Sequence, residues 1–79
     1  LNCRVPVKSS ATTITITLNG RPREVIAGTT VAELVRELGL LQEQVAVEKN
    51  ETLVRRRDQA ACGLSSGDVV EVVTLVGGG

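Results

Sequence analysis

The sequence contains no Phe, Trp, Tyr, Met or His, and its only cysteines are Cys3 and Cys62. Without aromatic rings it offers no platform on which single-stranded bases could stack, and its core must be built from Val, Leu, Ile and Ala. Without histidine, a Ser–His or Cys–His nucleophile pair is impossible. Two cysteines alone also fall short of the four ligands of a structural zinc site, so we predict no metal site.

The two cysteines lie near opposite ends of the chain, with nothing around them that marks secretion. A disulfide would suit a small secreted protein. We therefore interpret Cys3 as a thiol in a loose N-terminal segment and Cys62 as a small buried hydrophobic residue.

Charge and hydropathy exclude several further classes of protein. Nine basic and nine acidic residues give zero net charge, which argues against binding to nucleic acid or to an anionic membrane through bulk charge. No apolar run approaches the roughly 18 residues that cross a bilayer, and residues 1–12 lack the apolar stretch of a signal peptide. We expect a cytoplasmic protein with no nucleic-acid or membrane partner.

Neither glycine-rich phosphate motif, G-x-x-x-x-G-K-[ST] or G-x-G-x-x-G, occurs in the chain. Nothing in it therefore resembles a site for ATP or a dinucleotide. We expect no bound cofactor, and a protein that is acted on by enzymes rather than an enzyme itself.

The first half of the chain predicts a β-hairpin followed by a helix. Thr and Ile alternate over residues 13–18, Asn19-Gly20 is a strong hairpin signal, and Pro22 places the returning strand at a sheet edge. Thr30 and Glu33 form a predicted capping box. The apolar stripe of the helix is Val31, Leu34, Val35 and Leu38, and Gly39 suits its C-terminal cap.

The second half predicts three more strands, at residues 45–47, 53–54 and 69–76. Because the last is the most apolar, we place it in the sheet centre, parallel to the first. The result is an α+β fold of the ubiquitin-like β-grasp type, with a mixed sheet of four to five strands and one main helix packed on one face. We divide the chain into an N-terminal tail or vector-derived extension (1–11), the β-grasp domain (12–76) and a flexible glycine tail (77–79).

The ending Gly77-Gly78-Gly79 directly after this strand is either a frayed end or the working part of the molecule. A terminal carboxylate is ionised at neutral pH and is a poor electrophile, so chemistry on it requires activation by another protein. Three extended glycines reach about 10–11 Å and pass through a channel too narrow for side chains.

Alternation along the last strand predicts which side chains are exposed. If Val70, Val72 and Thr74 face the helix, Val73 and Leu75 lie on the opposite face. An exposed aliphatic patch beside the tail is a natural docking surface. The alternative is that the N-terminal tail or a neighbouring molecule shields it.

Several of these segments together resemble the ThiS family of bacterial sulfur carriers in thiamine biosynthesis. They are ITITLNGRP, AGTTVAELVRELGL, VAVEKNETLVRR and SSGDVVEVVTLVGGG, within residues 13–79. The chain departs from the family pattern at Asn50-Glu51, where Asn-Gly is frequent, and at Val54-Arg55-Arg56, where Val-Pro-Arg is frequent. The charge run Arg55–Arg57 is either a solvated loop or a contact for an acidic partner, and family position favours Arg56 for that contact.

The resemblance implies a mechanism and a set of partners. A ThiF-like enzyme would use ATP to adenylate the Gly79 carboxylate, a sulfur-donor enzyme would convert it to a thiocarboxylate, and a ThiG-like thiazole synthase would take the sulfur. Gly77, Gly78, Val76, Leu75 and Val73 would contact these partners. The alternatives are the small subunit of molybdopterin synthase or another thiocarboxylate carrier, and a β-grasp interaction module that carries no sulfur.

Overall fold

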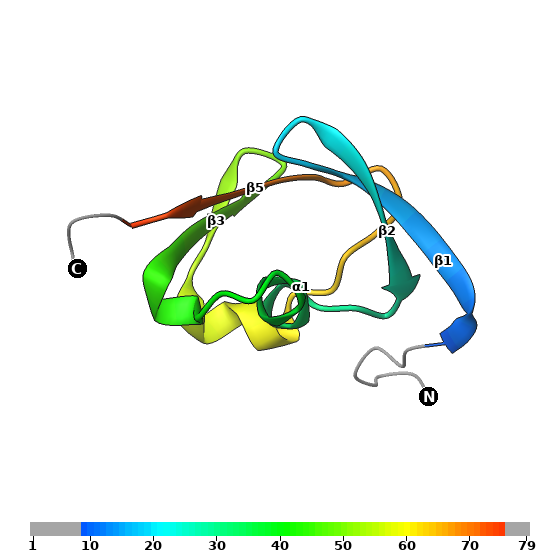
Figure 1. The fold of residues 1–79 in the computed structure, drawn as a ribbon, viewed down its shortest axis with the longest axis horizontal. Coiled ribbons are helices and arrows are strands. Elements are labelled where there is room, and N and C mark those ends of the chain that lie inside the picture. Colours follow the sequence, from blue (N-terminus) through cyan, green and yellow to red (C-terminus); the bar gives the residue numbers. More distant parts are fainter. Residues whose placement is uncertain (1–8, 76–79) are drawn as a thin grey trace.

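A computed structural model describes residues 9–75, which form one five-stranded mixed sheet with helices on one face (Figure 1). The sheet order is β2-β1-β5-β3-β4. The last strand pairs parallel to the first and antiparallel to β3. The predicted β-grasp arrangement, with the last strand central, is therefore confirmed. The elements in chain order are β1 (Ser9–Leu18), β2 (Arg21–Ala27), α1 (Val31–Glu37), η1 (Gln42–Gln44), β3 (Val45–Lys49), β4 (Thr52–Val54), η2 (Arg56–Ala61) and β5 (Val69–Thr74).

The β1–β2 hairpin closes at Asn19 and Gly20, whose φ angles of 51° and 84° are the positive values that a type I′ turn requires. Pro22 lies on β2, the outermost strand, as predicted. The strand β1 begins at Ser9, within the segment that we assigned to the tail, because Ser9 pairs with Ala27 across an irregularity before Thr13.

Both predicted ends of α1 are confirmed. The Glu33 amide donates to Thr30 Oγ1 at 3.2 Å, and the Thr30 amide donates to Glu33 Oε1 at 3.1 Å. At the other end Gly39 has φ 79°. Its amide and that of Leu40 bond back to the carbonyls of Arg36 and Val35, which is the Schellman pattern.

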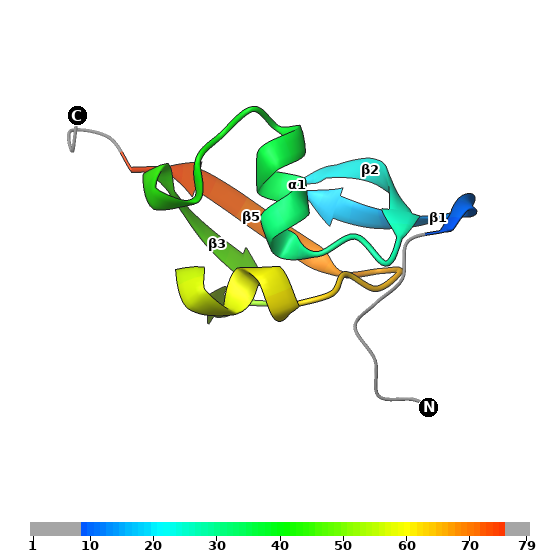
Figure 2. The same cartoon turned by 90° about the horizontal axis from the view of Figure 1, so that it is seen from below.

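The core lies between the sheet and α1, and it is aliphatic throughout. Figure 2 shows α1 and η2 side by side on the same face of the sheet. Of the predicted stripe, Val31, Leu34 and Val35 are fully buried, whereas Leu38 is half-buried. The strands contribute Ile16, Val25, Val45, Val47, Val54, Val70 and Val72.

The helix η2 was not predicted from the sequence. It is built around Gln59, a polar residue that is only 2% exposed. Its side-chain Nε2 donates to the Val54 carbonyl at 3.2 Å, and its Oε1 accepts from Gln42 Nε2 at 3.0 Å. These bonds tie η2 to the end of β4 and to η1. Cys62, which follows η2, is half-buried against the core, whereas Cys3 lies outside the described residues.

Candidate functional site

The strand β5 leads directly to the predicted tail. The start of β1 and the end of β5 lie at opposite ends of the long axis (Figures 1 and 2). The last hydrogen bond described along β5 joins the Leu75 amide to the Gln44 carbonyl at 2.7 Å. Val76 and Gly77–Gly79, which we predicted to be part of the site, lie outside the described residues.

The start of β5 is held by a polar network around Asp68, which is 8% exposed. Its carboxylate accepts from the Ser65 amide at 2.8 Å and from Asn50 Nδ2 at 3.1 Å, and Lys49 Nζ lies 3.8 Å away. Asn50 also bonds to both the amide and the carbonyl of Val69. These five polar contacts restrain the strand where it enters the sheet.

Along β5 the predicted alternation of exposed and buried side chains is confirmed up to Val73. Val70 and Val72 face the core, at 0% and 7% exposed, whereas Val73 and Leu75 are each 55% exposed. Thr74 differs from the expectation, because it is exposed although it lies on the same side of the strand as Val72. The side of the strand that faces the core is therefore buried at Val70 and Val72 but exposed at Thr74, where the strand ends.

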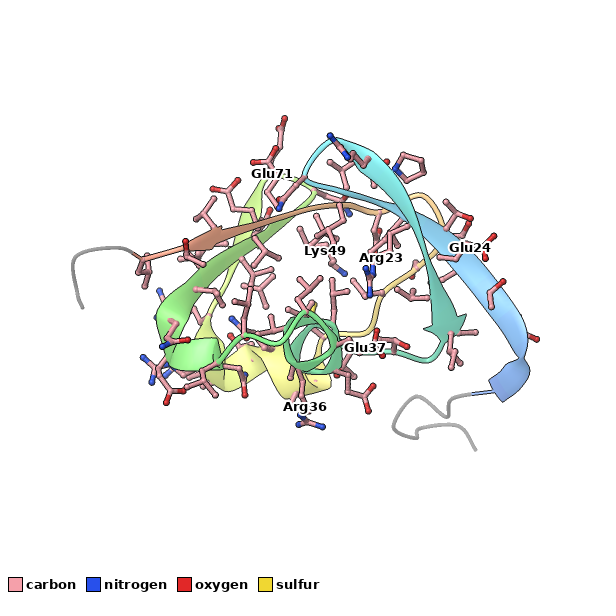
Figure 3. The ribbon with its side chains drawn as sticks, viewed as in Figure 1. Arg23, Glu24, Arg36, Glu37, Lys49 and Glu71 are labelled. Carbon is pink, nitrogen blue, oxygen red and sulfur yellow. The ribbon has the colours of Figure 1, made fainter. Side chains whose placement is uncertain are left out.

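The outer face of the sheet, on the side away from α1, combines apolar and acidic residues. Leu53 and Val69 are 59% and 45% exposed. Between these positions Glu48 and Glu71 stand directly opposite one another on β3 and β5. Figure 3 shows Glu71 pointing away from α1. Neither glutamate forms an ion pair with another residue in the range 9–75.

Arg56 does not belong to this face. It is exposed at the start of η2, and η2 packs beside α1 on the inner side of the sheet (Figure 2). The structure therefore brings Val73 and Leu75 together but leaves Arg56 on the other side.

Asn19 has a second role that the turn signal did not reveal. Its Nδ2 donates to the Val72 carbonyl at 3.2 Å, and its Oδ1 accepts from the Val72 amide at 2.8 Å. The side chain thus replaces one residue of a neighbouring strand, just where β1 ends. The Asn-Gly pair predicts the turn, but no local pattern indicates a contact between residues 53 positions apart.

The described residues 9–75 contain no group of three His, Cys, Asp or Glu side chains placed to hold a metal ion. No helix in this part of the chain is long and apolar enough to cross a membrane.

Comparison with known proteins identifies the family. The ThiS family model matches residues 16–79. The sulfur carrier protein ThiS of Thermus thermophilus is 42% identical over 62 residues, which cover 78% of this chain and 95% of that protein. The crystal structure of the thiamine biosynthesis protein ThiS from Geobacter metallireducens superposes with a TM-score of 0.67 at 34% identity. The superposed region covers 84% of this chain and 100% of the chain from Geobacter metallireducens.

A second group of relatives is much longer. The thiazole synthase of Magnetococcus marinus is 45% identical over 64 residues, which cover 81% of this chain but only 20% of that enzyme. The thiazole synthase of Paramagnetospirillum magneticum is matched over the same share of its length. This chain thus spans about a fifth of the thiazole synthases that it matches. The family match, the sulfur-carrier relative and the shared fold together confirm the resemblance seen in the sequence motifs: the chain belongs to the ThiS family.

Proposed function

We propose that the chain is a sulfur carrier of thiamine biosynthesis, and that its Gly79 carboxylate is the group that carries the sulfur. The observation that supports this most directly is the placement of β5. The strand is anchored at the centre of the sheet and ends at one extreme of the molecule. Val73 and Leu75 are exposed there, and three glycines follow Leu75 and Val76 in the sequence.

The chemistry requires two displacement steps. In the first, a Gly79 carboxylate oxygen attacks the α-phosphorus of ATP and pyrophosphate leaves, which produces an acyl-adenylate. In the second, a sulfur nucleophile at the oxidation level of sulfide attacks the acyl carbon and AMP leaves, which produces the thiocarboxylate. The chain has no histidine and so no Ser–His or Cys–His pair, and it carries neither glycine-rich phosphate motif that would hold ATP. Both steps therefore take place on partner enzymes.

The partners follow from the same proposal. A ThiF-like adenylating enzyme binds ATP and the tail, a sulfur-donor enzyme delivers sulfur, and a ThiG-like thiazole synthase accepts it. Relatives that bear the name thiazole synthase and contain a segment similar to this chain support the last assignment. The carrier binds no cofactor and acts as a protein co-substrate in the cytoplasm.

Each predicted site residue has a place in this scheme. Gly77 and Gly78 present no side chain to a narrow channel, Val76 lies at its mouth, and Val73 with Leu75 forms an apolar contact outside it. Arg56, on the other side of the sheet, contacts an acidic group of one partner.

The test is intact-mass analysis of the chain ending at Gly79, after incubation with the adenylating enzyme, ATP and a sulfur source. We expect a mass shift that matches the replacement of one oxygen by sulfur. A variant lacking Gly78 and Gly79 is the matched control and should show no shift while melting at the same temperature. If the full chain shows no shift while an authentic carrier is converted under the same conditions, the proposal is wrong. Subsequent incubation with a thiazole synthase or a molybdopterin synthase identifies the pathway.

A further inference from the structure

Beyond Val72, β5 has an unpaired edge on the side of β1. The parallel pairing between β1 and β5 extends only to Leu18 opposite Val70, because the chain then turns away at Asn19-Gly20. The Asn19 side chain continues the pairing by one step, to Val72. Thr74 is the next residue whose backbone faces this side.

The hydrogen bonds along β5 show which way the Thr74 backbone points. The Val69 carbonyl and the Leu75 amide bond to the β3 side, at Asn50 and Gln44. The carbonyls of Asp68 and Val70 accept from β1 and its turn, at Thr17 and Asn19. Because backbone groups alternate along a strand, the N–H and C=O of Thr74 point away from β3. No residue in the range 9–75 bonds to them there.

Next to this edge lies an open groove of about 510 Å³, lined mainly by apolar side chains together with Asn19 and Thr74. Its walls are Leu18, Leu38 and Leu40, and its other side is formed by residues 72–74 of β5. The three leucines are half-buried. Leu40 is directed there by the Schellman ending of α1, in which its amide bonds to the Val35 carbonyl at 3.2 Å.

We propose that an extended segment of the adenylating enzyme adds to β5 as a further strand at this edge. Its backbone bonds to the N–H and C=O of Thr74, and one of its apolar side chains fills the groove beside Leu40. An unpaired strand edge with an adjacent apolar pocket is the surface used in recognition by strand addition. The inference rests on the proposed function only in its choice of partner.

Continuity with the tail is the reason for choosing this occupant. In the sequence only Val76 separates Leu75, the last described residue, from the glycines that the enzyme acts on, so an enzyme segment bound at Thr74 lies within a few residues of its target. The chain's own N-terminal segment precedes Ser9, which lies at the other end of the long axis (Figure 1). A second copy of the chain would compete for the same edge, which the test below distinguishes.

The sharpest variant is Thr74→Pro. Proline removes the N–H that points to the open edge, leaves the β3 side of the ladder intact, and is tolerated in strands at such positions. Thr74→Val is the matched control, since it removes the hydroxyl but keeps the N–H. Loss of one interfacial hydrogen bond corresponds to about tenfold weaker binding. We expect that loss for Thr74→Pro in calorimetric titration with the adenylating enzyme, and less than about a twofold change for Thr74→Val.

A second pair of variants tests the groove. Leu40→Glu places a charge in it, whereas Leu41→Glu alters the next residue, which is 55% exposed and does not line it. Leu40→Glu should weaken binding more than Leu41→Glu does. Because Leu40 also packs against the core, thermal melting of both variants accompanies the titration.

Amide hydrogen exchange decides between the outcomes without relying on sulfur transfer. The Thr74 amide should exchange freely in the isolated chain and become protected in the complex. A complex that forms while this amide still exchanges freely, or that tolerates Thr74→Pro, overturns strand addition and leaves the proposed function standing. Protection that rises with the concentration of the chain alone assigns the edge to a second copy instead. If the chain neither binds the enzyme nor gains mass, both proposals are wrong.

Discussion

The two halves of β5 differ in how they are held. From Val69 to Val72 the strand has neighbours on both sides, with β3 on one side and β1 on the other, where Asn19 supplies the last contact. From Val73 to Leu75 hydrogen bonds are described only on the β3 side. The composition hardly changes between the halves, so the difference comes from where the neighbouring elements end. The first half is held from both sides, whereas the second has an edge to which no residue in the range 9–75 bonds.

Replacing equivalent valines in the two halves should give the largest contrast. Val70→Ala removes two methyl groups from a site that is 0% exposed and should lower the free energy of unfolding by about 2 kcal/mol. Val73→Ala, at 55% exposed, should change it by less than about 0.5 kcal/mol. Urea denaturation of both variants measures the contrast, and equal losses would contradict the division of β5.

Asn19→Gly should shorten the part of β5 that is hydrogen-bonded on both sides, because Asn19 supplies the last contact on the β1 side. Glycine retains the positive φ of the turn but leaves the amide and carbonyl of Val72 without their side-chain partners. We expect a loss of about 1–2 kcal/mol in unfolding free energy and faster hydrogen exchange at the Val72 amide. Unchanged exchange at Val72 would show that Asn19 does not extend the paired half.

The first half of β5 is held by Asn50 of the β3–β4 turn, and a substitution at the next residue, Glu51, should stabilise this turn. Glu51 has φ 69°, a left-handed conformation that disfavours residues other than glycine by about 1–2 kcal/mol. Glu51→Gly should therefore raise the free energy of unfolding by about 1 kcal/mol, less than the full strain because glycine is also freer in the unfolded chain. Glu51→Ala removes the charge but keeps the strain, so it should show no comparable gain in urea denaturation.

The smallest expected effect concerns charge on the outer face. Glu71 lies directly opposite Glu48, and like charges in that position are mildly destabilising. Glu71→Lys should raise the free energy of unfolding by about 0.5 kcal/mol at low salt, and the gain should shrink in high salt because exposed charges are screened. A gain that is independent of salt would point to packing rather than charge.

Local patterns in the sequence predicted the elements well. The Thr–Ile alternation, the Asn19-Gly20 turn, the Thr30–Glu33 capping box and Gly39 each determine the backbone within a few residues, and all are present in the structure. The central parallel position of β5 also followed from its apolar composition. These features depend on neighbours in sequence or on burial alone.

The features that sequence reasoning missed depend on long-range contacts of polar residues. Gln59 is buried because Val54 and Gln42 satisfy its amide, and Asn19 reaches across to Val72. Nothing in the local sequence distinguishes these residues from exposed ones. For the same reason the sequence did not show that Arg56 and the patch of Val73 and Leu75 lie on different sides of the sheet, or that an open edge borders Thr74.

The pairing of the first strand with the last also governs how the domain folds. Thr17 pairs with Val69, so the sheet centre closes a loop that spans most of the chain, and such long-range pairing slows folding relative to local contacts. Of the strand pairs described in residues 9–75, the two that do not involve β5 are the β1–β2 and β3–β4 hairpins, and an isolated hairpin is marginally stable. On a ribosome, the core therefore cannot close until the residues next to the glycines have emerged. Closure of the core is thus coupled to the placement of β5, the strand that precedes the glycines in the sequence.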